Sequence, residues 1–148
     1  MNYIYKTNLT KRFIASLLDY SFTLLVLYAY VELFGHDNAE GAREVTGFML
    51  LPIPCFWLIY FVIVEASFGG TLFHLMLNLK VLMLNHNQIR FEQALARHLI
   101  DPIDFFWFGI PAIIAIKRTD KHQRIGDLWA KTIVVDTSDE LQVPHNFR

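Results

Sequence analysis

The feature that most constrains this chain is a run of twenty residues, 45–64, that contains no charged side chain. As an α-helix, a run of this length spans about 30 Å, the thickness of the hydrocarbon core of a bilayer. Only 18% of the chain is charged, whereas a soluble domain carries about a quarter. The run therefore predicts a membrane-spanning helix. It disfavours a soluble globular enzyme, and so apolar a chain is not disordered.

A second apolar stretch, residues 13–34, precedes this run and is interrupted by Asp19. It is longer than the apolar region of a signal peptide, and no A-x-A cleavage pattern follows it. We interpret it as a retained first span, with residues 47–64 as the second. Pro52 and Pro54 fall in the first turns of the second span, where a missing backbone N–H costs least.

The basic residues predict an orientation. All of the 13 Lys and Arg residues except Arg43 lie outside the loop of residues 35–46 that joins the two spans. Cytoplasmic loops carry the excess of Lys and Arg. We therefore expect both termini and the central segment to lie on the cytoplasmic side, and the loop on the other side.

A third apolar segment, residues 105–116, is too short for an ordinary span, since twelve helical residues cover only about 18 Å. Gly109 and Pro111 interrupt its middle, and basic residues flank both of its ends. A single crossing would place one basic flank outside. We therefore predict a re-entrant hairpin with a buried apex near residues 109–111. A true third span is the alternative.

Smaller elements are expected between and after the apolar segments. Apolar residues at helical spacing in 72–79 predict a short interfacial helix with Thr71, His74 and Asn78 on its polar face. Residues 80–84 and 89–91 are typical of a small β-hairpin, with residues 132–136 as a third strand. The expected fold is thus an all-α integral membrane protein with two transmembrane helices, a third short or re-entrant hairpin and a small cytoplasmic β element. It occupies residues 1–136, and residues 137–148 form a polar tail.

Three carboxylates stand close to or within the apolar segments. Asp19 lies inside the first span, where an ionised side chain costs roughly 2.5–3.5 kcal/mol, so it must face protein, water or a cation. Arg12 is on the same helical face but about 10.5 Å away along the axis, so each should pair elsewhere in the fold. Asp101 and Asp104 either cap a helix that begins near Pro102 or line a polar cavity.

The most specific motif lies near the end of the chain, at residues 123–135, which read Q-R-x-G-D-x-x-A-x-T-x-V-V. Together with Arg12, Ala15 and Asp19, this motif resembles the RDD family of small membrane proteins, which is named after one arginine and two aspartates. The resemblance implies that these are Arg12, Asp19 and Asp127. The middle motif departs from the family pattern, because Phe73 and His74 stand where Gly-Lys is usual, Asn78 replaces a glycine and Lys80 replaces an arginine.

The closing motif has two interpretations. Gly126 permits a turn before a helix and Asp127 can cap that helix, so the motif can be a structural junction that holds the C-terminal strand. Alternatively, Arg124 and Asp127 form a charge network with Arg12 and Asp19, which would supply the counter-charges that Asp19 needs.

Two functional classes are compatible with these patterns. No nucleophile, phosphate-loop or metal-ligand motif is present, so we expect no enzymatic activity, no cofactor and no metal. Nor does the chain have a basic stripe for nucleic acid. The first class is an assembly or accessory module that associates with itself or with another membrane protein. The second is a transporter of a monovalent cation or proton that uses buried carboxylates. The resemblance implies a bacterial cytoplasmic membrane, and some family members are linked to sodium–proton exchange.

Overall fold

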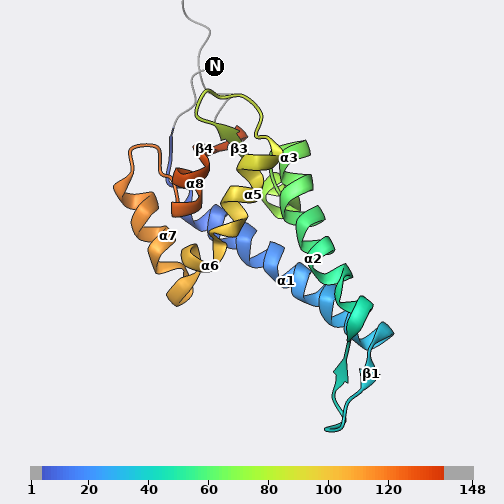
Figure 1. Ribbon diagram of the computed structural model, residues 1–148. Coiled ribbons are helices and arrows are strands. Elements are labelled where there is room, and N and C mark those ends of the chain that lie inside the picture. The colour runs from blue at the N-terminus through green and yellow to red at the C-terminus, as the bar shows by residue number, and fades with distance from the viewer. Residues whose placement is uncertain (1–4, 139–148) are drawn as a thin grey trace, which may run out of the picture.

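The computed structural model describes residues 5–138, and most of these residues are helical (Figure 1). The proposed polar tail lies almost entirely outside the described residues. Two short strand pairs accompany the helices. In chain order the elements are α1 (Leu9–Phe34), β1 (His36–Asp37), β2 (Arg43–Glu44), η1 (Gly47–Leu50), α2 (Pro52–Trp57), η2 (Leu58–Ile63), α3 (Val64–Phe68), α4 (Leu72–Met76), β3 (Leu79–Met83), α5 (Phe91–Leu99), α6 (Asp101–Asp104), α7 (Phe106–Arg118), α8 (Ile125–Ala130) and β4 (Thr132–Asp136).

Two long helical stretches form one limb of the molecule (Figure 1). They are α1 and the continuous stretch Gly47–Phe68, and both are long and apolar enough to cross a membrane. Only 17% of the most apolar part of each is buried, which distinguishes them from the core helices of a soluble protein. The antiparallel β1–β2 turn joins them at the far end. Gly35 begins this turn. A Cβ there would lie 2.4 Å from the carbonyl oxygen of Val31, so a larger residue would collide with the end of α1.

The second stretch changes its winding where it meets the rest of the protein. The η2 segment is π-helical, and the N–H of Val64 bonds to the carbonyl of Ile59, five residues earlier. Such wider turns are frequent at functional sites because one extra residue re-aims the side chains. Here Tyr60, Phe61 and Val62 are all buried, and Tyr60 is directed towards α1.

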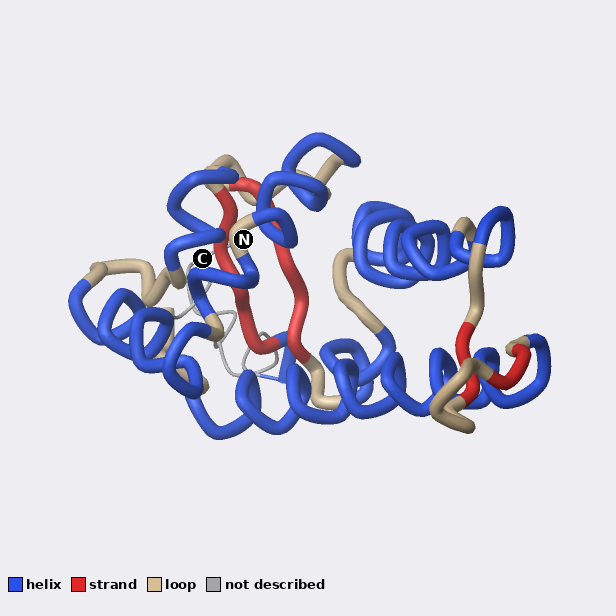
Figure 2. Tube along the Cα trace, turned by 60° about the horizontal axis from the view of Figure 1, so that its bottom comes forward, coloured by secondary structure: helices blue, strands red, loops and turns tan. Residues whose placement is uncertain are grey.

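The other limb contains the β3–β4 pair surrounded by short helices (Figure 2). The strands are antiparallel, from Leu79 opposite Asp136 to Met83 opposite Thr132. Apolar side chains from α1, η2, α5 and both strands form the main core. They are Ala15, Val62, Leu79, Val81, Ile89, Ala94 and Val134.

This arrangement corrects the predicted short elements. Residues 89–91 form no strand beside β3; one isolated bridge, Leu82–Gln88, remains. Ile89 is instead buried in the core, and α5 begins two residues later. Residues 132–136, expected as a third strand, pair directly with β3 because they offer a five-residue ladder. The predicted helix 72–79 ends at Met76, since Asn78 has a φ of 61°.

The third apolar segment reverses direction at the start of α7 (Figure 1). Three successive residues at the reversal, Trp107, Phe108 and Gly109, adopt positive φ angles. The reversal thus begins slightly before the predicted apex at residues 109–111, and Pro111 falls in the first regular turn that follows. The chain by itself leaves the reversal uncovered, since Trp107 is 70% and Phe108 96% exposed, so the burial of the apex stays a prediction.

Candidate functional site

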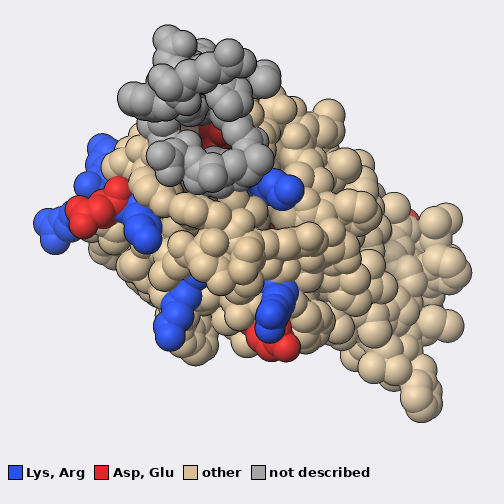
Figure 3. Space-filling model, turned by 90° about the horizontal axis from the view of Figure 1, so that it is seen from above, with Lys and Arg blue, Asp and Glu red and all other residues tan. Residues whose placement is uncertain are grey.

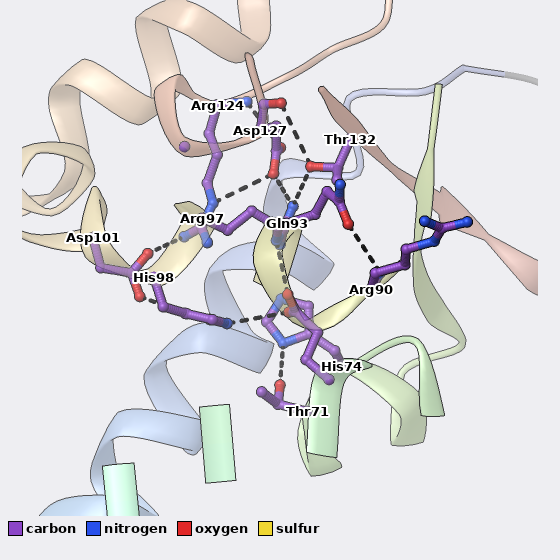
Figure 4. A network of polar contacts seen from close by, with 12 residues as sticks. Thr71, His74, Arg90, Gln93, Arg97, His98, Asp101, Arg124, Asp127 and Thr132 are labelled. Atoms are coloured by element: carbon purple, nitrogen blue, oxygen red, sulfur yellow. Dashed lines mark hydrogen bonds and ion pairs between the residues drawn. The ribbon is translucent and has the colours of Figure 1, made fainter. Parts of the chain in front are cut away.

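Asp127 lies at the centre of a buried group of charges where α1, α5 and α8 meet (Figure 4). One of its carboxylate oxygens accepts a hydrogen bond from Nη2 of Arg12 at 2.6 Å, and the other accepts one from Nη1 of Arg97. The backbone N–H of Arg124 also donates to Asp127, at 3.0 Å. Burial by itself raises the pKa of Asp127, but the charges of Arg97, Arg12 and Arg124 outweigh it and hold that pKa at about 2.

Arg97 extends this group towards the second long helical stretch. Its Nε donates to Glu65 at 2.9 Å, and Glu65 is 3.3 Å from Nε2 of His98. The other ring nitrogen of His98 is 2.7 Å from Asp101. Burial disfavours the charged ring, but Glu65 and Asp101 outweigh burial and raise the pKa of His98 to about 9. His98 is therefore a cation at neutral pH.

Asp101 and Asp104 connect α6 to α8 and α1. Asp101 pairs with Nη1 of Arg124 at 2.9 Å and accepts a hydrogen bond from the hydroxyl of Tyr20 at 2.5 Å. Despite burial, Arg124 and His98 hold the pKa of Asp101 well below its usual range. Asp104 accepts the backbone N–H groups of Ile125 at 3.0 Å and Gly126 at 2.9 Å.

These contacts correct the predicted capping. Neither Asp101 nor Asp104 caps its own helix; Asp104 caps the first turn of α8, which begins twenty-one residues further along the chain. Gly126 was expected to permit a turn, but the structure requires a glycine there because other atoms lie very close. A Cβ at Gly126 would lie 2.8 Å from the carbonyl oxygen of Arg97 and 3.0 Å from Asp104. The glycine allows α8 to approach α5 and α6 closely.

We call these eight side chains the arginine cluster. Four are basic and four are carboxylates, and each is at most 9% exposed. Every member has at least one oppositely charged partner within 4 Å, which offsets part of the cost of burying it. The members are Arg12, Arg97, His98, Arg124, Glu65, Asp101, Asp104 and Asp127.

Asp19 is held separately, by groups from η2 and α4. Its Oδ1 accepts hydrogen bonds from the hydroxyl of Tyr60 at 2.5 Å and the backbone N–H of Phe73 at 3.3 Å. Its Oδ2 lies 2.5 Å from the hydroxyl of Thr71 and 2.8 Å from Nδ1 of His74. We call these five residues the Asp19 pocket.

The Asp19 pocket corrects two expectations. No arginine within residues 5–138 forms an ion pair with Asp19, so its counter-charge does not come from Arg12 or Arg124. Thr71 and His74, expected on the outer face of an interfacial helix, turn inward to bind it. Burial lowers the pKa of His74, although the neighbouring Asp19 opposes this, so burial favours the neutral ring.

A very small cavity of about 10 Å³ separates the pocket from the cluster. Asp19 and His74 of the pocket and Glu65, His98 and Asp101 of the cluster all line it, whereas Asp104 does not. A space of this size accommodates at most about one water molecule. Within residues 5–138, no three His, Cys, Asp or Glu side chains are arranged to hold a metal ion.

The sequence identified some of these residues and missed others. All six predicted residues are buried, and they are Arg12, Asp19, Asp101, Asp104, Arg124 and Asp127. It missed Glu65, Arg97 and His98 as cluster members, and Tyr60, Thr71 and His74 as partners of Asp19. One signal was present for Glu65, which is the first charge after the uncharged run and is therefore close to the bilayer.

Comparison with known proteins agrees with the motif at residues 123–135. A family model described as the RDD family matches residues 6–131, which is most of the chain. No curated protein and no solved structure matches the chain.

Proposed function

The chain belongs to the RDD family, and from this premise we propose that it is a non-enzymatic integral membrane module that assembles with itself or with another membrane protein. The family and the two long apolar helices indicate a membrane protein. In the proposed topology, α1 and Gly47–Phe68 cross a bacterial cytoplasmic membrane, and both termini lie in the cytoplasm. The α6–α7 hairpin enters the membrane from the same side without crossing it.

The observation that carries this proposal is the contrast between matched charges and uncovered apolar helices. The arginine cluster is balanced within itself and leaves almost no internal space. Most of the surface of the two long stretches is left uncovered by the rest of the chain, and Leu24, Leu25 and Tyr28 on α1 are each about two-thirds exposed. Two spans enclose no pathway by themselves. Their uncovered surface is open to lipid and to further spans, and association with further spans would rest on close side-chain packing.

The oligomeric state in a bilayer tests the proposal. The protein would be labelled at its single cysteine, Cys55, which is exposed, and reconstituted at low density for counting of single-molecule bleaching steps. We expect more than one step per particle, or a co-purified membrane partner in native membranes. A Cys55→Ser variant controls for non-specific labelling. Single steps together with the absence of a partner would overturn the proposal.

A second candidate function, transport of a proton or monovalent cation, is favoured by Asp19. This carboxylate has hydroxyl, amide and imidazole partners but no arginine partner among residues 5–138, and it lines the small cavity near His98. The test uses liposomes that contain a pH dye and receive Na⁺, K⁺ or Li⁺ pulses. Cation-dependent proton flux that is lost in Asp19→Asn at equal incorporation would favour transport. Absence of flux above empty liposomes would exclude it.

A further inference from the structure

A narrow apolar groove lies between the start of α1 and the α6–α7 hairpin. Its volume is about 320 Å³, at the lower end of the range for small-molecule pockets. Residues at helical spacing line it from each side, among them Leu9, Arg12, Phe13 and Ser16 from α1, and Gly109, Ala112, Ile113 and Ile116 from α7. Seven residues of helix make it about 10 Å long. We call it the α1–α7 groove.

The groove stays open because α7 packs mainly on α6 and α8. Its apolar walls are only partly covered, since Phe13 is 61% and Phe108 96% exposed. Apolar walls of this kind are poor partners for water.

A second hollow continues from the α1–α7 groove at its basic end. This wider depression, of about 750 Å³, shares Leu9 and Thr10 with the groove. Its other lining residues are polar or basic and include Lys6, Lys11 and His122. Among the described residues, neither hollow has a carboxylate in its lining, although Lys11 pairs with Asp136 nearby. In a view from this end, Lys and Arg side chains outnumber Asp and Glu (Figure 3).

Two contiguous hollows, one apolar and one basic, match a molecule with an apolar chain and an anionic head. We propose that an anionic phospholipid binds here, with one acyl chain in the α1–α7 groove and its phosphate over the basic depression. Arg12 and Arg124 also line the groove, although both pair with carboxylates of the arginine cluster. Anionic lipids are attracted to basic surfaces next to a membrane. The proposed site depends on neither assembly nor transport.

The geometry favours this occupant over two others. A helix of a second copy is about 10–12 Å across with its side chains, which is too wide for a hollow of this volume. A free phosphate ion would use the basic depression but leaves the apolar groove unexplained. The length of the groove fits part of one acyl chain.

The test compares lipids that differ in one feature, using delipidated protein in detergent. Native mass spectrometry and thermal unfolding would be recorded with phosphatidylglycerol, with phosphatidylcholine and with glycerol phosphate. We expect one retained phosphatidylglycerol per chain and a higher Tm with this lipid alone. Ala112→Phe fills the groove and should weaken its retention at least about tenfold. Ala29→Phe, on the exposed surface of α1, should change it less than about twofold.

Several outcomes would overturn the proposal. Equal stabilisation by both lipids would remove the role of the basic depression, and stabilisation by glycerol phosphate would indicate a simple anion site. Unchanged retention in Ala112→Phe, or its loss together with dimer dissociation, would move the ligand away from the groove. If Ala112→Phe fails to fold, photolabelling of the wild-type protein still tests the site. A phosphatidylglycerol with a photoreactive acyl chain should label peptides that contain Phe13 or Ile113, whereas labelling spread evenly along both long stretches would contradict the site.

Discussion

The arginine cluster and the Asp19 pocket lie on either side of one small cavity, yet they solve the burial of a carboxylate differently. Asp127 is surrounded by three arginines, whereas Asp19 is held by a tyrosine, a threonine, a backbone amide and a histidine. A charge matched by opposite charges resists any change of its protonation state. A carboxylate held by neutral hydrogen-bond donors leaves no buried arginine unpaired when it is neutralised. The cluster therefore depends more strongly on its central carboxylate charge than the pocket does.

The largest expected effect comes from neutralising the centre of the cluster. Asp127→Asn leaves Arg12 and Arg97 buried without their shared partner, and breaking such pairs costs about 3–5 kcal/mol. We expect a severe loss of folded protein in membranes and a much lower Tm in detergent. Asp37→Asn is the matched control, because the side chain of Asp37 is 71% exposed in a surface pair. A wild-type yield and Tm for Asp127→Asn would remove the cluster as a stabilising element.

The two histidines should respond to pH in opposite directions. The raised pKa of His98, about 9, means that its stabilisation is present below about pH 6.5 and is lost as the pH rises through 9. The effect is on the order of 3 kcal/mol. The lowered pKa of His74 predicts a loss of stability as the pH falls below about 6.5.

Thermal unfolding between pH 5 and about pH 9.5 measures both responses. His98→Gln should flatten the alkaline side of the profile, and His74→Gln the acidic side. If either substitution left its side of the profile unchanged, the corresponding histidine would not be coupled to folding. A flattening of the same side by both would contradict the difference between the two regions.

The next largest loss of stability is expected from a change where α8 packs closely against α5 and α6. Gly126→Ala places a methyl group against the carbonyl of Arg97 and the carboxylate of Asp104, and such overpacking costs about 1–3 kcal/mol. We expect a lower Tm with no change in the Asp19 pocket, whose residues lie elsewhere. The measurement is the chemical or thermal unfolding of the variant beside the wild type. Equal stability would mean that α8 is free to shift.

The smallest effect is expected in the Asp19 pocket. Asp19→Asn keeps the size of the side chain and loses no ion pair with an arginine, so its cost should be about 1–2 kcal/mol. Tyr60→Phe, which removes one hydrogen bond to the same carboxylate, should cost about 1 kcal/mol. The measurement is the thermal unfolding of Asp19→Asn and Tyr60→Phe beside that of Asp127→Asn. A loss in Asp19→Asn as large as that in Asp127→Asn would erase the proposed distinction.

Much of the molecule was predictable from local patterns. The two long stretches follow from runs of apolar residues, because the transfer of a helix into hydrocarbon is close to a sum over its own side chains. The burial of Asp19, Arg12 and Asp127 was also predictable, since the apolar surroundings and the motif at residues 123–135 point to it. The existence of a reversal near Gly109 followed from the short length of that segment and its basic flanks.

The pairing of these parts was decided only by the tertiary structure. Asp104 caps α8, which begins twenty-one residues later in the chain, and β3 pairs with β4 across about fifty residues. His74 faces Asp19 because α4 packs against α1. Hydropathy and helix length depend on neighbours in the chain, so the sequence alone determined the spans and the charges that must be buried. A hydrogen bond between distant segments depends on how their helices pack, and spacing along the chain carries no record of that geometry.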